Sequence, residues 1–140
     1  MTETQRITPF IGYEDAAAAI AWLERAFGFV EDRESRYEED GTITHAELEL
    51  DGARVYVSTP AGYASPRRMR EGSDLARRAY DNPWVIDGLY VEVEDVAAHF
   101  ERARDAGATI LREPEEPGIG ARIYSAEDIE GHRWMFGQPV

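Results

Sequence analysis

The sequence predicts an α+β fold made of two βαβββ modules within a single domain, residues 1–140. A strand-like segment, a helix-like segment and three further strand-like segments occur twice in the same order. Matching landmarks of the two copies lie 80, 79 and 79 residues apart, which indicates an internal repeat. These landmark pairs are Asp15 with Asp95, Gly28 with Gly107, and Gly52 with Gly131. With 43% hydrophobic and 11% aromatic residues, a chain of this length can bury a core.

The first module, about residues 6–58, begins with a strand at 7–13 and a helix that starts after Asp15. Asp15 is a typical N-cap, and Gly28 is typical of the residue that ends a helix. The apolar side chains of this helix recur at helical spacing, so one face should pack on a sheet. They are Ile20, Leu23 and Phe27.

Three strands complete the first module. A polar strand at 29–37 leads to the Asp40-Gly41 turn, and an alternating strand follows at 43–50. The Asp51-Gly52 pair predicts a hairpin turn into the last strand, 53–58.

A connector at 59–87 separates the modules and is rich in proline, glycine and arginine. We expect a short helix near 73–80 within it, and connectors of this length are often functional. Its basic stretch, Arg67–Arg78, either caps the acidic surface of a dimer partner, closes over a binding cleft or lies in solvent.

The second module, about residues 88–138, repeats the pattern. A strand at 88–93 precedes a helix at 96–106, which Gly107 ends. Three strands follow, at 108–112, 121–125 and 133–137. We expect Trp134 and Phe136 in the core beneath the helix, and His132 in a turn.

Composition excludes several kinds of chemistry and partner. The chain has no cysteine and no lysine, which excludes disulfides, thiol nucleophiles and Schiff-base catalysis. A net charge of −13 argues against a nucleic-acid partner and favours a neutral or cationic small ligand, unless the charge serves solubility alone. No run is long and apolar enough for a membrane span, and the polar start is unlike a signal peptide. We therefore expect a cytoplasmic protein with no membrane partner.

Three short segments carry a family resemblance. They are Ile7-Thr8-Pro9-Phe10 with the later Ala26-Phe27-Gly28, His45-Ala46-Glu47-Leu48 before Asp51-Gly52, and Asp128-Ile129-Glu130-Gly131-His132-Arg133-Trp134. With the duplicated module, they resemble the glyoxalase-like branch of the vicinal oxygen chelate superfamily, which includes glyoxalases, bleomycin-resistance proteins and dioxygenases. Ile129 departs from that pattern, because proline is usual there.

The resemblance implies a curved mixed sheet around a U-shaped cleft, with helices on the convex face. Enzymes of this superfamily hold a divalent metal through four side chains, mostly His and Glu. The matching positions here carry Thr8, Tyr56, Gly88 and Met135. None of these is a good metal ligand, so we expect no metal and no cofactor. The pattern then resembles the branch that sequesters an antibiotic in a homodimer.

Aromatic residues at expected cleft positions suggest a ligand-binding wall. Tyr56, Tyr90 and Tyr124 occupy such positions, and Trp84 precedes the second module. Arg122 shares the alternation of Tyr124 and either holds an anionic group or pairs with an acidic residue. The alternative is that the rings fill a core. The predicted ligand-binding set is Thr8, Tyr56, Trp84, Tyr90, Arg122, Tyr124 and Met135.

His45 and Glu47 share one face of the strand 43–50, opposite its apolar residues. They form either a general-base pair or part of a solvated sheet face. For Glu49, which shares this face, we favour the solvated sheet face. The leading hypothesis is a metal-independent protein that sequesters an aromatic or cationic compound in a homodimer cleft. The alternative is a lyase or isomerase with His45 and Glu47 as base and Arg122 as clamp.

Overall fold

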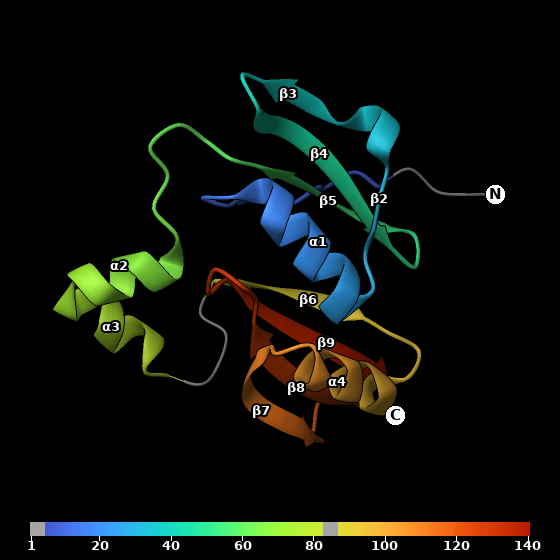
Figure 1. Cartoon of the computed structure of the whole chain (residues 1–140). Helices are drawn as coiled ribbons and strands as arrows, with labels where there is room; N and C mark the ends of the chain where they lie inside the picture. Colours follow the sequence, from blue (N-terminus) through green and yellow to red (C-terminus); the bar gives the residue numbers. More distant parts are fainter. Residues whose placement is uncertain (1–4, 83–86) are drawn as a thin grey trace. The chain divides into compact units, whose positions relative to one another are not determined.

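The computed structural model describes residues 5–82 and 87–140 (Figure 1). Its tertiary contacts divide the chain into two compact units, Met1–Ala64 and Ser65–Val140. The first module forms the first unit, and the helices of the connector belong to the second. The expected single domain stays a prediction, and so does the U-shaped cleft.

The first unit contains a mixed sheet with the strand order β1-β5-β4-β2. Its members are β1 (Phe10–Gly12), β5 (Ala53–Ser58), β4 (Thr42–Leu50) and β2 (Val30–Glu31), while β3 (Tyr37–Glu39) pairs separately with β4. β1 runs parallel to β5, and the β2–β4, β3–β4 and β4–β5 pairs are antiparallel. The first strand of the module thus pairs with its last.

Helix α1 (Ala16–Phe27) covers one face of this sheet (Figure 1). The Asp15 side chain accepts a hydrogen bond from the Ala18 amide, and Gly28 ends the helix with a φ of 84°. A positive φ suits glycine because it has no Cβ. The apolar residues of α1 pack against alternate residues of β4 and β5. The buried strand residues are Ala46, Leu48, Val55 and Val57.

The prediction of one strand at 29–37 is wrong. A 3₁₀ turn, η1 (Arg33–Ser35), separates β2 from β3. The Ser35 hydroxyl donates to the Asp32 carboxylate at 2.7 Å, and such local bonds compete with strand pairing. The neighbouring Glu31 carboxylate is buried and accepts two bonds from Arg36, at 2.6 and 2.8 Å.

The connector contains two helices where one was expected. The predicted helix is α3 (Asp74–Tyr80), and the unpredicted one is α2 (Pro66–Gly72). Ser65 and Ser73 cap them by accepting from backbone amides. The Ser65-Pro66 pair is a helix-start signal, because proline suits the first helical position.

The second unit repeats the arrangement with the strand order β6-β9-β8-β7. The strands are β6 (Gly88–Glu92), β9 (Arg133–Pro139), β8 (Ala121–Glu127) and β7 (Thr109–Glu115). β6 is parallel to β9, and the other pairs are antiparallel. Two mixed sheets, each carrying a helix, confirm the predicted α+β class of βαβββ modules.

Helix α4 (Val96–Asp105) begins after Asp95, whose side chain accepts from the Ala98 amide at 3.1 Å. It covers the face of the second sheet that holds Trp134 and Phe136, both fully buried as predicted. In the parts of the chain that the structure describes, no helix has the length and apolar character needed to cross a membrane.

The turn between β8 and β9 is organised by Asp128, a buried carboxylate. Its Oδ1 accepts from the amides of Glu130 and His132, at 3.1 and 3.0 Å. Its Oδ2 accepts from Nε1 of Trp134 at 3.0 Å. These contacts join the turn to the core, and they place His132 in the predicted turn.

Candidate binding site

The face of the first sheet opposite α1 carries side chains in register across three strands. Phe10 of β1 lies beside Tyr56 of β5, which lies beside Glu47 of β4. Their neighbours along each strand, such as Ile11 and Val57, are buried toward α1. Tyr56 therefore faces away from the helix, because successive residues of a strand point to opposite faces.

Four rings form a cluster that we call the aromatic face: Phe10, Tyr37, His45 and Tyr56. Ring centroids are 5.2 Å apart for Phe10 and Tyr56, in an edge-to-face arrangement. The His45 ring lies 4.8 Å from Tyr56 and 6.1 Å from Tyr37. Phe10 is 75% exposed and Tyr37 is 66% exposed. A group of rings left open to solvent is typical of a binding surface rather than of a core.

A carboxylate lies within the aromatic face. Oε2 of Glu47 is 3.0 Å from Nε2 of His45, and Oε1 is 3.5 Å from Nη1 of Arg54. The Glu47 side chain is 19% exposed, so a ligand can still reach it. The arrangement can hold a positive group beside the rings, or the His45–Glu47 pair can exchange a proton.

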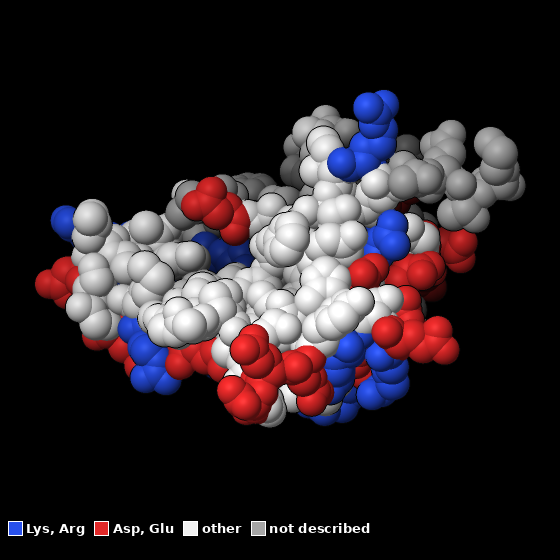
Figure 2. All heavy atoms as spheres, turned by 90° about the horizontal axis from the view of Figure 1, so that it is seen from above, with Lys and Arg blue, Asp and Glu red and all other residues white. Residues whose placement is uncertain are grey.

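Other acidic residues are spread over the surface. On the side seen in Figure 2, they form several groups beside arginines. A shallow hollow bordered by Glu31, Asp32, Glu49 and Asp51 is acidic but contains no aromatic side chain. This distribution agrees with the view that most of the negative charge serves solubility.

The second sheet also has a face turned away from its helix. Tyr90, Met135 and Ser125 lie side by side across β6, β9 and β8. Tyr90 is 50% exposed, and its ring lies over Gly137, where a Cβ atom would come within 2.5 Å of the ring carbon Cζ. The absence of a side chain at Gly137 therefore lets the tyrosine lie along the strand.

The prediction that Tyr124 points toward this open face is wrong. Tyr124 is fully buried on the α4 side, and its hydroxyl is 2.5 Å from Nδ1 of His99. The β8–β9 register pairs it with Phe136, whose ring it stacks against at 5.3 Å. Burial raises the pKa of the Tyr124 hydroxyl above its ordinary value. Arg122 shares this side of β8 and is exposed, so its predicted cleft orientation is also wrong.

The remaining predicted residues have mixed outcomes. Thr8 is half-buried before β1, with its Oγ1 3.4 Å from Nε2 of Gln5. Trp84 lies outside the described residues. Of the predicted set, the structure groups Tyr56 with the aromatic face and Tyr90 with Met135 on the second sheet.

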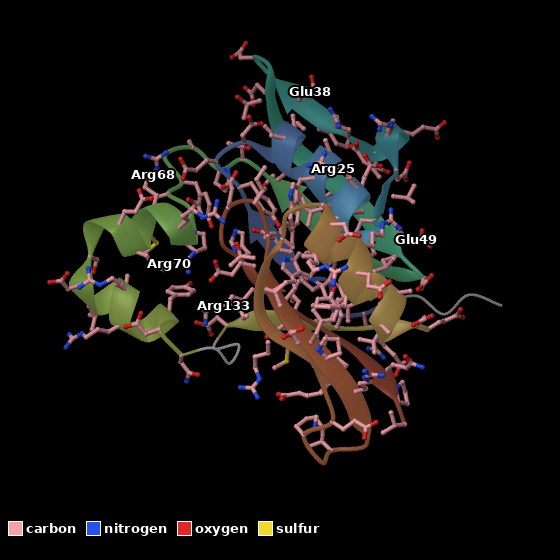
Figure 3. The ribbon with its side chains drawn as sticks, turned by 60° about the horizontal axis from the view of Figure 1, so that its bottom comes forward. Arg25, Glu38, Glu49, Arg68, Arg70 and Arg133 are labelled. Carbon is pink, nitrogen blue, oxygen red and sulfur yellow. The ribbon has the colours of Figure 1, made fainter. Side chains whose placement is uncertain are left out.

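Arginines of the connector contact the end of the second sheet and its β8–β9 turn. Arg70 of α2 and Arg133 of β9, both labelled in Figure 3, bond to the carboxylate of Glu127 at 2.7 and 3.1 Å. Both guanidinium groups also lie over the ring of Tyr80, at 4.7 and 4.9 Å. Arg67 donates to the backbone carbonyls of Ile129 and Asp128. Part of the basic stretch therefore fastens the connector to the sheet.

The donor set does not fit the four-ligand metal site that the resemblance implies. The matching positions hold a hydroxyl, a phenol, a glycine and a thioether, at Thr8, Tyr56, Gly88 and Met135. Among residues 5–82 and 87–140, no group of three or more His, Asp or Glu side chains could hold a metal ion. His45 and Glu47 are neighbours, but two donors do not make such a site.

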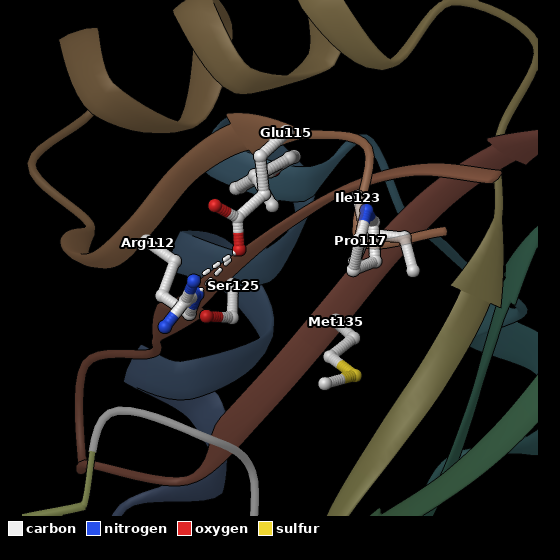
Figure 4. A pocket seen from close by; sticks show the side chains of 7 residues that line it. Arg112, Glu115, Pro117, Ile123, Ser125 and Met135 are labelled. Atoms are coloured by element: carbon white, nitrogen blue, oxygen red, sulfur yellow. Dashed lines mark hydrogen bonds and ion pairs between the residues drawn. The ribbon is translucent and has the colours of Figure 1, made fainter. Parts of the chain in front are cut away.

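A small hollow opens on the second sheet (Figure 4). Its volume is about 10 Å³, which is room for roughly one water molecule. The side chains around it are Arg112, Glu115, Pro117, Ile123, Ser125 and Met135, and Tyr124 borders it. Arg112 Nε donates to Glu115 at 2.7 Å along one side.

Sequence reasoning missed several members of these faces. Phe10 could have been found, because it alternates with the apolar Ile11 in the first strand. Tyr37 could not have been found, because it lies opposite His45 only through a register shift in the β3–β4 pair, and the sequence does not indicate that shift. Ser125 was overlooked because Tyr124 was assigned to the open face, and neighbouring residues of a strand point to opposite faces.

The sequence and the fold both match known proteins. Residues 6–136 match the Glyoxalase/Bleomycin resistance protein/Dioxygenase superfamily. The uncharacterized protein Rv0887c of Mycobacterium tuberculosis (strain ATCC 25618 / H37Rv) is 31% identical over 134 residues, covering 96% of this chain and 74% of that protein.

Among solved structures, TioX from Micromonospora sp. ML1 is 28% identical, with a TM-score of 0.69 and 97% coverage of both chains. TnmS3, described as an antibiotic binding protein from Streptomyces sp. CB03234, is 15% identical, with a TM-score of 0.66 and coverage of 100% and 99%. At that identity, TnmS3 supports the fold alone.

Proposed function

The chain belongs to the glyoxalase/bleomycin resistance protein/dioxygenase superfamily, and we propose that it binds a small aromatic or cationic molecule without a metal ion. The observation that carries the proposal is the aromatic face, with its exposed rings around the carboxylate of Glu47. A flat ligand that stacks on these exposed rings takes apolar surface of both partners away from water, which favours binding.

Charge favours a cation among aromatic ligands. A positive group over an aromatic ring gains about 0.5–1 kcal/mol at exposed sites. Glu47 adds a nearby negative charge that is mostly shielded from solvent, although His45 and Arg54 share it. The net charge of −13 also attracts cations over longer distances at low salt. TnmS3, an antibiotic binding protein with the same fold, supports the idea that this fold can serve antibiotic binding.

A matched pair of probes tests the proposal. Tryptamine carries an indole ring and an ammonium group, whereas tryptophol has the same ring with a neutral hydroxyl. We expect calorimetry to give tighter binding of tryptamine, and Glu47→Gln to weaken it about 3- to 10-fold. Glu49→Gln removes the same charge further along β4 and serves as the control. If both variants bind like the wild type, Glu47 has no role in recognition.

The proposal includes binding without a metal. The elemental content of untagged protein, purified without chelator, tests this part. We expect well below one equivalent of Zn, Fe, Ni or Mn per chain. Near one equivalent would refute the metal-independent reading and make His45 and Glu47 the first candidate ligands.

We also propose that the protein works as a homodimer that sequesters its ligand. The support is the resemblance to the antibiotic-binding branch of the superfamily. Analytical ultracentrifugation with and without tryptamine tests the oligomeric state. A monomer under both conditions would refute this part and leave ligand binding by the aromatic face intact.

One observation favours a second function, a lyase or isomerase. The 3.0 Å contact between His45 and Glu47 is a geometry in which the carboxylate orients the imidazole as a base. The predicted clamp, Arg122, lies on the α4 side of its sheet, which weakens this candidate. Substrate turnover that His45→Ala and Glu47→Ala both abolish would favour it over sequestration.

A further inference from the structure

Ser125 is a buried polar residue of the second sheet's open face. It is 1% exposed, and its Oγ has no hydrogen-bond partner among the residues that the structure describes. Buried hydroxyl groups are nearly always paired, so an exception calls for an explanation. Because Tyr124 and Ala126 face α4, Ser125 faces the opposite side, where it lines the small hollow.

We propose that Ser125 is the hydrogen-bond donor of a ligand subsite that takes an acceptor oxygen, such as a carbonyl, at the edge of an aromatic ligand. The inference rests on the proposed function for the class of ligand, an aromatic molecule, whose ring would here contact Tyr90 and Met135 beside the hollow. It concerns the second sheet alone and does not require a ligand shared with the aromatic face. Met135 pairs with both Tyr90 and Ser125 across the sheet, so the three side chains form one continuous strip.

The walls of the hollow favour an acceptor. Ser125 can donate its hydroxyl proton, and the guanidinium group of Arg112 can only donate. The one carboxylate there, Glu115, is already bonded to Arg112 at 2.7 Å (Figure 4). Pro117, Ile123 and Met135 are apolar, so they offer an entering oxygen no competing bond.

The size of the hollow limits what enters. About 10 Å³ accommodates a single oxygen atom or one water molecule, but not a ring. A ligand would therefore place one oxygen at Ser125 while its ring stays outside, against the exposed Tyr90.

Stability of the ligand-free protein gives the first test. An unpaired or water-paired buried hydroxyl stabilises the fold little, so Ser125→Ala should raise Tm or leave it unchanged, by up to about 5 °C. Thr109→Val removes an exposed hydroxyl at the end of the neighbouring strand and is the control, with little change expected. A fall in Tm of more than about 3 °C in Ser125→Ala alone would show that the hydroxyl is a structural group, which overturns the proposal.

Binding of two matched fluorinated probes gives the second test, read by fluorine NMR. The probes are 4-fluoroacetophenone and 1-ethyl-4-fluorobenzene, which differ by a carbonyl in place of a methylene group. We expect the wild type to bind the ketone about 3- to 10-fold more tightly, and Ser125→Ala to bind both alike.

The outcomes separate the subsite from the proposed function. If both probes bind the wild type equally, the aromatic ligand stands and the subsite at Ser125 is overturned. A preference for the ketone that persists in Ser125→Ala overturns it too. If neither probe binds while tryptamine does, the second sheet takes no part in binding and the subsite falls. If tryptamine also fails, the proposed function itself is refuted.

Discussion

Replacing Asp128 by alanine should destabilise the protein strongly, because one carboxylate joins three donors. Trp134 is fully buried, and its Nε1 would lose the carboxylate acceptor that lies 3.0 Å away. The amides of Glu130 and His132 would lose bonds of 3.1 and 3.0 Å. A buried unsatisfied donor costs about 1–3 kcal/mol and a partly exposed one less, so we expect a total of about 3 kcal/mol.

The assay is urea unfolding followed by circular dichroism, with thermal unfolding beside it. For 140 residues the unfolding entropy near Tm is about 0.3 kcal/mol/K, so 3 kcal/mol corresponds to a fall of about 10 °C. Asp128→Asn keeps an oxygen for the two amides but turns an NH₂ group toward Trp134, so it should cost about half as much.

A double-mutant cycle isolates the contact with the indole. Trp134→Phe removes the donor, and in that background Asp128→Asn should cost about 1 kcal/mol less than in the wild type. An Asp128→Ala variant within about 0.5 kcal/mol of the wild type would refute the reasoning, since the turn would then be stable without its carboxylate.

Three further predictions concern the second unit. Burial raises the pKa of the Tyr124 hydroxyl, so the folded state favours the protonated form and the free energy of unfolding should fall as pH rises above about 10. In urea titrations between pH 9 and 11, Tyr124→Phe should flatten this fall. Equal pH slopes for the variant and the wild type would contradict the prediction. Arg70→Ala leaves the carboxylate of Glu127 with fewer partners and should cost about 1–2 kcal/mol in urea unfolding, whereas an unchanged midpoint would mean that α2 is held by other contacts. Gly137→Ala should displace the ring of Tyr90 and weaken the binding of 4-fluoroacetophenone about 3- to 10-fold. The Tm should change by less than about 3 °C. Unchanged affinity for the ketone would exclude Tyr90 from the site.

Much of the fold was predictable because local signals and the repeat agree. Asp15 and Asp95 cap their helices in the same way, and Gly28 and Gly107 both follow with positive φ. A capping side chain and a glycine stop act within a few residues, so the sequence alone identifies them. The β2–η1–β3 segment was not predictable, because a serine–aspartate bond within the turn overrides the strand pattern.

The site was less predictable because it depends on register. Tyr56 and Tyr90 face away from the helices of their units, but their role in binding stays a prediction. Tyr124 was wrongly oriented because both faces of β8 carry buried residues, so alternation gives no signal there. Its pairing with Phe136, which was correctly assigned to the core, would have corrected the error.

The central claim is that the aromatic face of the first sheet binds an aromatic cation. Amide chemical-shift mapping with tryptamine tests it most directly, because it reports where the probe binds as well as whether it does. The account predicts saturable shifts concentrated on β1, β3, β4 and β5 around Phe10, His45 and Tyr56, and smaller ones for tryptophol. Saturable shifts confined to other elements, or none at all, would contradict it.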